Sequence, residues 1–207
     1  MSKKKYFVLG LVIFGIFVLF SYFVHKGLLA SSDFDNTVRL QDHLPRRLDE
    51  PFSFLSFVGT FQVVIAVLII ILLMYRKLSG LFVLFLFGVF HVIELYGKTF
   101  VKHNPPPHFL LRTHLPFNFP QFYISTENSY PSGHAARALF LTTIIFIIAY
   151  KSKKLSQTQK MIVLGILIIY DILMLTSRVY LGEHWTSDVI GGTLAGLGLA
   201  LISAIAL

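Results

Sequence analysis

The chain has 207 residues, of which 55% are hydrophobic and only 14% are charged. A soluble domain carries about a quarter of charged residues, so this composition excludes an ordinary soluble domain and indicates a membrane protein. The net charge of +8 does not indicate a nucleic-acid partner, because much of it comes from lysines in short loops and the sequence contains no RNA- or DNA-binding motif.

Six apolar segments follow one another along the chain, and with their flanks each reaches the roughly 17–25 helical residues that cross a bilayer. Backbone polar groups in lipid must be satisfied internally, so we expect helices. The segments comprise residues 6–24, 54–75, 80–96, 138–150, 161–176 and 189–207. The fourth needs residues 134–137 as its first turn, and the first could instead be a signal peptide, although its apolar core is long for one. The sequence therefore predicts an all-α bundle of six transmembrane helices in one domain, 1–207.

Basic residues gather at the N-terminus and in the second-to-third and fourth-to-fifth connections, where no acidic residue accompanies them. They are Lys3, Lys4, Lys5, Arg76, Lys77, Lys151, Lys153, Lys154 and Lys160. The positive-inside rule places such residues in the cytoplasm. We therefore expect both termini in the cytoplasm and the loops 25–53, 97–133 and 177–188 on the extracytoplasmic side of the cell membrane.

The longer outer loops have distinct compositions. Segment 25–53 mixes charged residues with leucines, which predicts a short amphipathic stretch at the membrane surface. Segment 100–131 is rich in prolines and aromatic residues, so we expect an irregular interfacial loop that caps a pocket opening toward lipid. In the last apolar segment, Gly192 and Gly196 allow another helix to approach closely; packing inside the bundle is the favoured interpretation, and a dimer seam is the alternative.

Two polar stretches at the ends of apolar segments carry residues suited to phosphate chemistry. Residues 131–134 read Pro-Ser-Gly-His, where Ser132 and the free N–H groups of a helix start make an anion site and Gly133 lets the backbone come close. Arg178 ends the fifth segment and can bind a phosphate bidentately.

Two histidines and a carboxylate complete this set. His184 and Asp188 lie four residues apart, so they share a face if the segment is helical. A carboxylate on one imidazole nitrogen fixes the tautomer and leaves the other nitrogen free for attack. With His134 nearby, one histidine can act as the nucleophile and the other as a general acid.

At these residues the chain resembles the type 2 phosphatidic acid phosphatases, whose fold is shared with the vanadium haloperoxidases. The second part of the family signature, Pro-Ser-Gly-His, is matched at residues 131–134, and the third, Ser-Arg, five residues, His, three residues, Asp, is matched at residues 177–188. The six-helix topology is similar to that of the integral-membrane branch, so the resemblance covers nearly the whole chain.

The resemblance implies a role for each matched residue. His184 would be the nucleophile that forms a phosphohistidine, Asp188 would orient it, and His134 would protonate the leaving group. The phosphoryl oxygens would be held by Ser132, Gly133 and Arg178. The family needs no metal, so we expect no cofactor.

The first part of the signature is incomplete. The family has Lys, six residues, Arg, Pro; here Lys98 matches, but Pro105 stands at the arginine position. A missing charge-assisted hydrogen bond would cost roughly 1.5–3 kcal/mol of phosphate binding. We expect Arg137, on the same helical face as His134, to compensate, with Arg112 as the second candidate and His103 as the third.

His91, Glu94 and Lys98 form a polar stripe along the third apolar segment, at spacings of three and four residues. The favoured interpretation is an ion pair between Glu94 and Lys98, and the alternative is that Glu94 directs Lys98 toward phosphate. A metal site with His91, Glu94 and His103 lacks a tight ligand spacing and is disfavoured. For Asp171, the favoured interpretation is a hydrogen bond that holds two helices together.

The sequence thus favours a membrane phosphatase that hydrolyses a lipid phosphate or a polyprenyl diphosphate at the outer leaflet. Phosphatidic acid, phosphatidylglycerol phosphate and an undecaprenyl carrier are the candidate substrates. A lipid phosphotransferase, in which another lipid accepts the phosphoryl group, and a non-catalytic lipid-phosphate binding protein are the alternatives. A channel fits the helices but not the paired motifs, and the sequence favours no oligomeric state.

Overall fold

The computed structural model describes residues 2–75, 78–113 and 127–207. These residues form eight α-helices, three short 3-10 helices and no strand, which confirms the all-α prediction. Arg76 and Lys77, and residues 114–126 of the proline-rich loop, lie outside the described residues.

Among the described residues, five helices are long and apolar enough to cross a membrane: α1 (Lys3–His25), α5 (Gly80–Phe100), α6 (Gly133–Lys151), α7 (Gln157–Tyr180) and α8 (Thr186–Ser203). As predicted, α6 includes the polar turn at residues 134–137, since it begins at Gly133. Ser132 caps this helix by accepting a hydrogen bond from the amide of Ala135.

The second predicted span, 54–75, is not one continuous helix. It divides into α3 (Asp49–Val58) and α4 (Phe61–Tyr75), and the helical stretches on either side of the break meet at a bend of 53°. Gly59 lies at the break, where a Cβ atom would come within 2.7 Å of Met174 and 2.9 Å of His134. The bend therefore brings the backbone of this segment against the first turn of α6.

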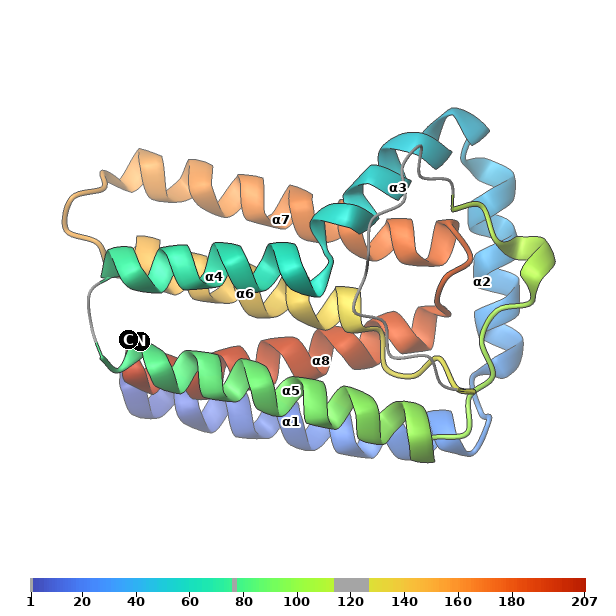
Figure 1. Ribbon diagram of the computed structural model, residues 1–207, viewed down its shortest axis with the longest axis horizontal. Helices are drawn as coiled ribbons and strands as arrows, with labels where there is room; N and C mark the ends of the chain where they lie inside the picture. The colour runs from blue at the N-terminus through green and yellow to red at the C-terminus, as the bar shows by residue number, and fades with distance from the viewer. Residues whose placement is uncertain (1, 76–77, 114–126) are drawn as a thin grey trace.

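The expected amphipathic stretch 25–53 consists of α2 (Ala30–His43), the 3-10 turn η1 (Arg46–Leu48) and the start of α3. Figure 1 shows α2 running across one end of the bundle, while both termini lie at the opposite end. The loop between α6 and α7 also lies at the end with the termini.

Close packing at the centre of the bundle involves α8, which packs against α1 and α6 (Figure 1). A Cβ atom at Gly192 would meet the carbonyl oxygen of Ser132, and one at Gly196 would meet that of Ala136. The glycine pair therefore serves packing inside the bundle, the favoured interpretation of the sequence.

Aromatic and aliphatic side chains fill the space between α5 and α6, where Phe87, Phe90, Phe140 and Ile144 are almost fully buried. Large apolar side chains are also exposed on the outer faces of α1, α4, α5 and α7, as expected where helices contact lipid. Examples are Val12, Leu19, Ile70, Leu73, Val92, Ile166 and Ile169.

Candidate active site

A cavity of about 860 Å³ lies at the end of the bundle away from the termini. Its wall is formed by α3 to α6, by residues 105–113 and 128–129 of the connection between α5 and α6, and by the turn between α7 and α8. We call it the site cavity. Its polar lining includes Ser56, Thr60, Gln62, His91, Glu94, Lys98, Thr113, His134, Arg137, Glu183 and His184.

His184 is held at the wall of the site cavity by the turn that joins α7 to α8. Gly182 enters the turn with a φ of 67°, a left-handed conformation that glycine adopts without steric cost. The amide of His184 then donates to the carbonyl oxygen of Arg178 at 3.2 Å. These contacts fix the backbone from which the imidazole projects.

Asp188 is completely buried and contacts His184 from the first turn of α8. Its Oδ2 lies 3.3 Å from Nδ1 of His184 and accepts a hydrogen bond of 2.9 Å from the amide of Trp185. Because Nδ1 faces the carboxylate, the free nitrogen of His184 is Nε2, which is the arrangement a nucleophilic imidazole needs.

His134 lies on another wall of the site cavity, in the first turn of α6. Its Nε2 is buried and has no hydrogen-bond partner among the residues that the structure describes. A buried imidazole nitrogen without a partner costs free energy, so a ligand that fills the cavity and bonds to this nitrogen is favoured. His134 is thus available to exchange a proton with a bound group.

Of the two residues predicted to form an anion site at the start of α6, one lines the site cavity and the other does not. Gly133 lines the site cavity, and a Cβ atom there would overlap with Glu94 and Arg137. Ser132 is fully buried; its amide donates to the carbonyl oxygen of Asp188 at 3.0 Å, and its hydroxyl caps the helix. Ser132 therefore connects α6 to α8 and does not line the cavity.

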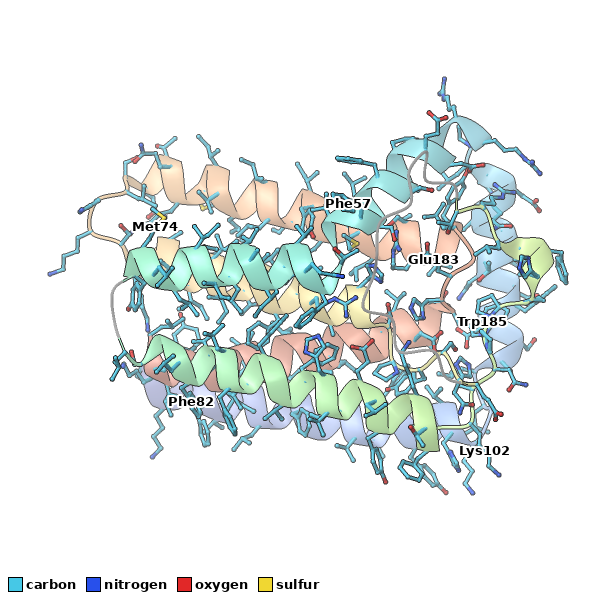
Figure 2. The ribbon with its side chains drawn as sticks, in the orientation of Figure 1. Phe57, Met74, Phe82, Lys102, Glu183 and Trp185 are labelled. Carbon is cyan, nitrogen blue, oxygen red and sulfur yellow. The ribbon has the colours of Figure 1, made fainter. Side chains whose placement is uncertain are left out.

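Arg178 is fully buried behind the site cavity, and all three of its nitrogens are engaged. Its Nη1 donates to the hydroxyl of Ser56 and to Oε2 of Glu183, each at 2.5 Å. Its Nε and Nη2 donate to the hydroxyl of Ser177. In Figure 2, Glu183 lies in the turn between α7 and α8. The guanidinium group of Arg178, which was expected to hold phosphate, is thus paired with the carboxylate of Glu183.

Lys98 and Arg137 place two further cations at the cavity wall, and Glu94 lies between them. Oε1 of Glu94 is 3.9 Å from Nζ of Lys98, and Oε2 is 3.4 Å from Nη1 of Arg137. Nε of Arg137 also donates to the carbonyl oxygen of Gly59 at 3.1 Å. The predicted ion pair between Glu94 and Lys98 is therefore present, and Arg137 shares the same carboxylate.

The comparisons with known proteins agree with this arrangement. Residues 76–206, more than half of the chain, match the PAP2 superfamily. This chain belongs to the PAP2 superfamily. It is 27% identical over 154 residues to phosphatidylglycerophosphatase B of Bacillus subtilis (strain 168), a match that covers 72% of this chain and 70% of that protein. It is 40% identical to the undecaprenyl-diphosphatase of Sulfolobus acidocaldarius over 93 residues, or 42% of this chain and 40% of the relative.

Two crystal structures have the same fold. The transmembrane PAP2-type phosphatidylglycerolphosphate phosphatase of Bacillus subtilis superposes with a TM-score of 0.75 at 23% identity, covering 94% of this chain and 93% of the other. Aquifex aeolicus LpxE superposes with a TM-score of 0.61 at 24% identity, covering 83% and 93%. The helical bundle is thus that of the membrane PAP2 phosphatases.

Within this PAP2 fold, two of the three residues considered as replacements for the missing arginine lie elsewhere. Arg112 does not line the site cavity; its Nη1 donates to the carbonyl oxygen of Gln41 at 3.2 Å, and its guanidinium lies over the ring of Tyr180. His103 is bonded to Asp188 and Asp33. Pro105 itself lines the cavity, so only Arg137 of the three stands at its wall.

Of the polar residues considered for other roles in this PAP2 chain, Asp171 joins two helices, whereas His91 bonds within its own helix and lines the site cavity. Asp171 accepts a hydrogen bond of 2.9 Å from the hydroxyl of Thr142 on α6. Nδ1 of His91 lies 2.8 Å from the carbonyl oxygen of Phe87, one turn earlier on α5. In the described part of the chain, no three His, Cys, Asp or Glu side chains are arranged so that they could hold a metal ion.

Sequence reasoning missed Ser56, Asp33 and the position of Glu183 in this PAP2 site. Ser56 contacts Arg178 from α3, 122 residues earlier in the chain. Asp33 binds the amide and the hydroxyl of Ser187 at 2.8 and 2.6 Å. An acidic residue in an amphipathic helix gives no local signal of such a contact, because the partner is specified only by the packing of α2 across the bundle.

Proposed function

We propose that this protein hydrolyses a lipid phosphate or polyprenyl diphosphate at the extracytoplasmic membrane surface, through a phosphohistidine formed on His184. The observation that carries the proposal is the pair formed by His184 and Asp188, which faces a cavity shared with His134 and two cations. Two of its relatives support this class of substrate: one is a phosphatidylglycerophosphatase and the other an undecaprenyl-diphosphatase.

In the first step, Nε2 of His184 attacks phosphorus and the bond to the lipid oxygen breaks. Asp188 holds the proton on Nδ1, so the attacking nitrogen keeps its electron pair. His134 transfers a proton to the leaving oxygen, which departs as an alcohol or as a shorter phosphate.

In the second step, water attacks the phosphohistidine and returns His184 to its starting state. His134, now deprotonated, accepts a proton from that water, and inorganic phosphate leaves. The phosphoryl charge is held in both steps by Lys98 and Arg137 at the cavity wall. Arg178 joins them when phosphate takes the place of the Glu183 carboxylate.

Access from the bilayer supports a lipid as the substrate. The site cavity is also lined by Phe61 on α4 and by Gly88, which is exposed in the middle of the apolar helix α5. A cavity that reaches a lipid-facing position of a spanning helix can receive a substrate whose chain remains in the membrane.

The extracytoplasmic location is supported by the distribution of charge. The turn between α7 and α8, which carries His184 at the cavity wall, lies at the opposite end of the bundle from the termini and from the loop between α6 and α7 (Figure 1). Those segments contain the clustered lysines, which remain on the cytoplasmic side of a membrane.

The function is tested with purified protein and a panel of phosphatidylglycerol phosphate, phosphatidic acid and undecaprenyl diphosphate, all in excess chelator. We expect phosphate release from at least one lipid, at a rate that the chelator does not change, because the proposed chemistry uses only protein groups. Release that requires added metal contradicts the mechanism. Binding without release from any of the three supports a non-catalytic protein, and transfer of label to a second lipid supports a phosphotransferase.

Access from lipid is tested by Gly88→Trp. A Cβ atom at Gly88 meets nothing within 4 Å, so the fold accepts a side chain there. We expect the indole to lower turnover of the lipid substrate about tenfold, a barrier of ~1.4 kcal/mol, and to leave hydrolysis of water-soluble para-nitrophenyl phosphate unchanged. Gly15→Trp is the matched control, because Gly15 is also unhindered but lies on α1. Equal loss with both substrates contradicts access through this opening.

A further inference from the structure

Four buried ionisable groups form a continuous row behind the nucleophile. Asp33 on α2 is followed by His103 after α5, then by Asp188 on α8, and finally by His184. Nε2 of His103 lies 3.4 Å from Oδ2 of Asp33, and its Nδ1 lies 2.8 Å from Oδ1 of Asp188. Asp33, His103 and Asp188 are 3%, 8% and 0% exposed, so bulk water does not screen these contacts. We call this set the acid–imidazole row.

We propose that His103 is a positioning residue that holds Asp188, as an ionised carboxylate of fixed orientation, against His184. The inference rests on the proposed function, because it concerns the residue that supports the nucleophile. It assigns a role to a histidine two residues before Pro105, in the segment where the family arginine is missing.

The backbone around His103 holds the imidazole in place. Its amide donates to Oδ1 of Asn128 at 3.0 Å, and its carbonyl oxygen accepts from the amide of Ser129 at 2.9 Å. The indole of Trp185 also donates to the carbonyl oxygen of Asn104 at 2.7 Å. The segment that contains His103 is therefore hydrogen-bonded both to the residues that precede α6 and to Trp185, the neighbour of His184.

Charge on His103 explains how two carboxylates stay buried so close together. Burial alone lowers the pKa of His103, but hydrogen bonds to Asp188 and Asp33 raise it, and the net pKa is about 9 against an ordinary value of 6.5. The titratable groups that face it are Asp33 from α2, Asp188 from α8 and Tyr130 from the segment before α6. His103 is thus an imidazolium at neutral pH, which donates a hydrogen bond to Asp188 and forms an ion pair with Asp33.

This second imidazole completes the hydrogen bonding of Asp188. Oδ2 of Asp188 accepts from the amide of Trp185 and faces His184, while Oδ1 is bonded to His103. With both oxygens engaged, the carboxylate cannot rotate away from Nδ1 of His184. Without His103, Asp33 and Asp188 lose the cation between them, and the repulsion between two buried like charges favours the uptake of a proton. A protonated Asp188 no longer accepts the proton of His184.

The test compares His103→Ala with His103→Asn, using any substrate that the wild-type protein hydrolyses. We expect His103→Ala to lower kcat by about a hundredfold, with KM changed by less than about twofold, because His103 lies behind the nucleophile and outside the cavity lining. We also expect the acidic limb of the kcat profile to move to higher pH. The amide of asparagine replaces Nδ1 as a donor to Asp188, so His103→Asn should recover part of kcat but none of the pH shift.

His108→Ala is the matched control, because His108 is an exposed histidine of the same segment. An unchanged kcat and pH profile in His103→Ala overturns the proposal. So does a loss that appears only in KM, which indicates contact with substrate. A wild-type protein without activity overturns the proposed function instead, and the two failures are thereby distinguished.

A second measurement does not depend on activity. Because the pKa of His103 is raised in the folded protein, its bound proton stabilises the fold fully below pH 6.5, and this contribution is lost as the pH rises to about 9. Thermal unfolding of the wild type should therefore show Tm falling across this range, and His103→Asn should lack that fall. Identical pH dependence in the two proteins shows that His103 carries no proton between the carboxylates and overturns the proposal even if the variant has low activity.

Discussion

Replacing His184 with glutamine is expected to lower phosphate release by about four orders of magnitude, because the substitution removes the nitrogen that attacks phosphorus. The side chain lines the site cavity and its Nδ1 lies 3.3 Å from Asp188. Glutamine keeps a comparable polar side chain but provides no nucleophile. Initial rates of phosphate release, with the protein in excess chelator, measure the effect.

The control for this substitution is His43→Gln, which changes an exposed histidine of α2 whose only described bond is to the carbonyl oxygen of Arg39. We expect it to retain wild-type turnover and the same Tm. A His184→Gln protein that keeps even a tenth of wild-type activity would show that another group attacks phosphorus.

The second large effect is expected at Arg137. Replacement by alanine should lower kcat/KM by about two to three orders of magnitude, the size of effect seen when one donor to a developing anion is lost. Arg137 is the cation that stands at the cavity wall in the absence of the family arginine, and it lies in the same helix as His134. Arg137→Lys should restore little, because lysine lacks the planar fork that binds two phosphoryl oxygens.

The buried contacts of Arg137 require a control that separates binding from folding. Loss of the guanidinium leaves Glu94 with Lys98 as its only remaining ion-pair partner in the described structure, at 3.9 Å. The double variant Arg137→Met, Glu94→Gln removes both charges and so removes that cost. If Arg137 binds phosphate, activity stays low in the double variant while Tm recovers. Recovery of activity together with Tm would show that the arginine serves only the fold.

Local patterns predicted much of this fold because they depend on neighbours in the sequence. The apolar lengths identified the spanning segments, and the small-residue turn at residues 131–134 identified the start of α6. The bend at Gly59 was missed, since residues 54–75 are continuously apolar and the break depends on contacts with Met174 and His134 in other helices. A pattern within one segment does not report the shape of the surface against which that segment packs.

The candidate site divides in the same way. His184 and Asp188 are four residues apart, so their contact follows from spacing alone. The contacts of His103 with Asp188 and of Arg178 with Ser56 join residues 85 and 122 positions apart, and only the assembled bundle brings them together. Glu183 is adjacent to His184, yet whether its carboxylate meets water or Arg178 depends on the turn made by Gly182.

The central claim, that phosphate passes through a covalent bond to His184, is tested most directly by trapping the intermediate. Wild-type protein is mixed with a lipid substrate whose terminal phosphate is radiolabelled. The reaction is stopped within milliseconds by alkaline detergent, which preserves phosphohistidine. We predict label on the protein, located at His184 by mass spectrometry of its peptides and absent from His184→Gln. Rapid hydrolysis with no label on the wild-type protein at any time point, or label on a different residue, would contradict the account.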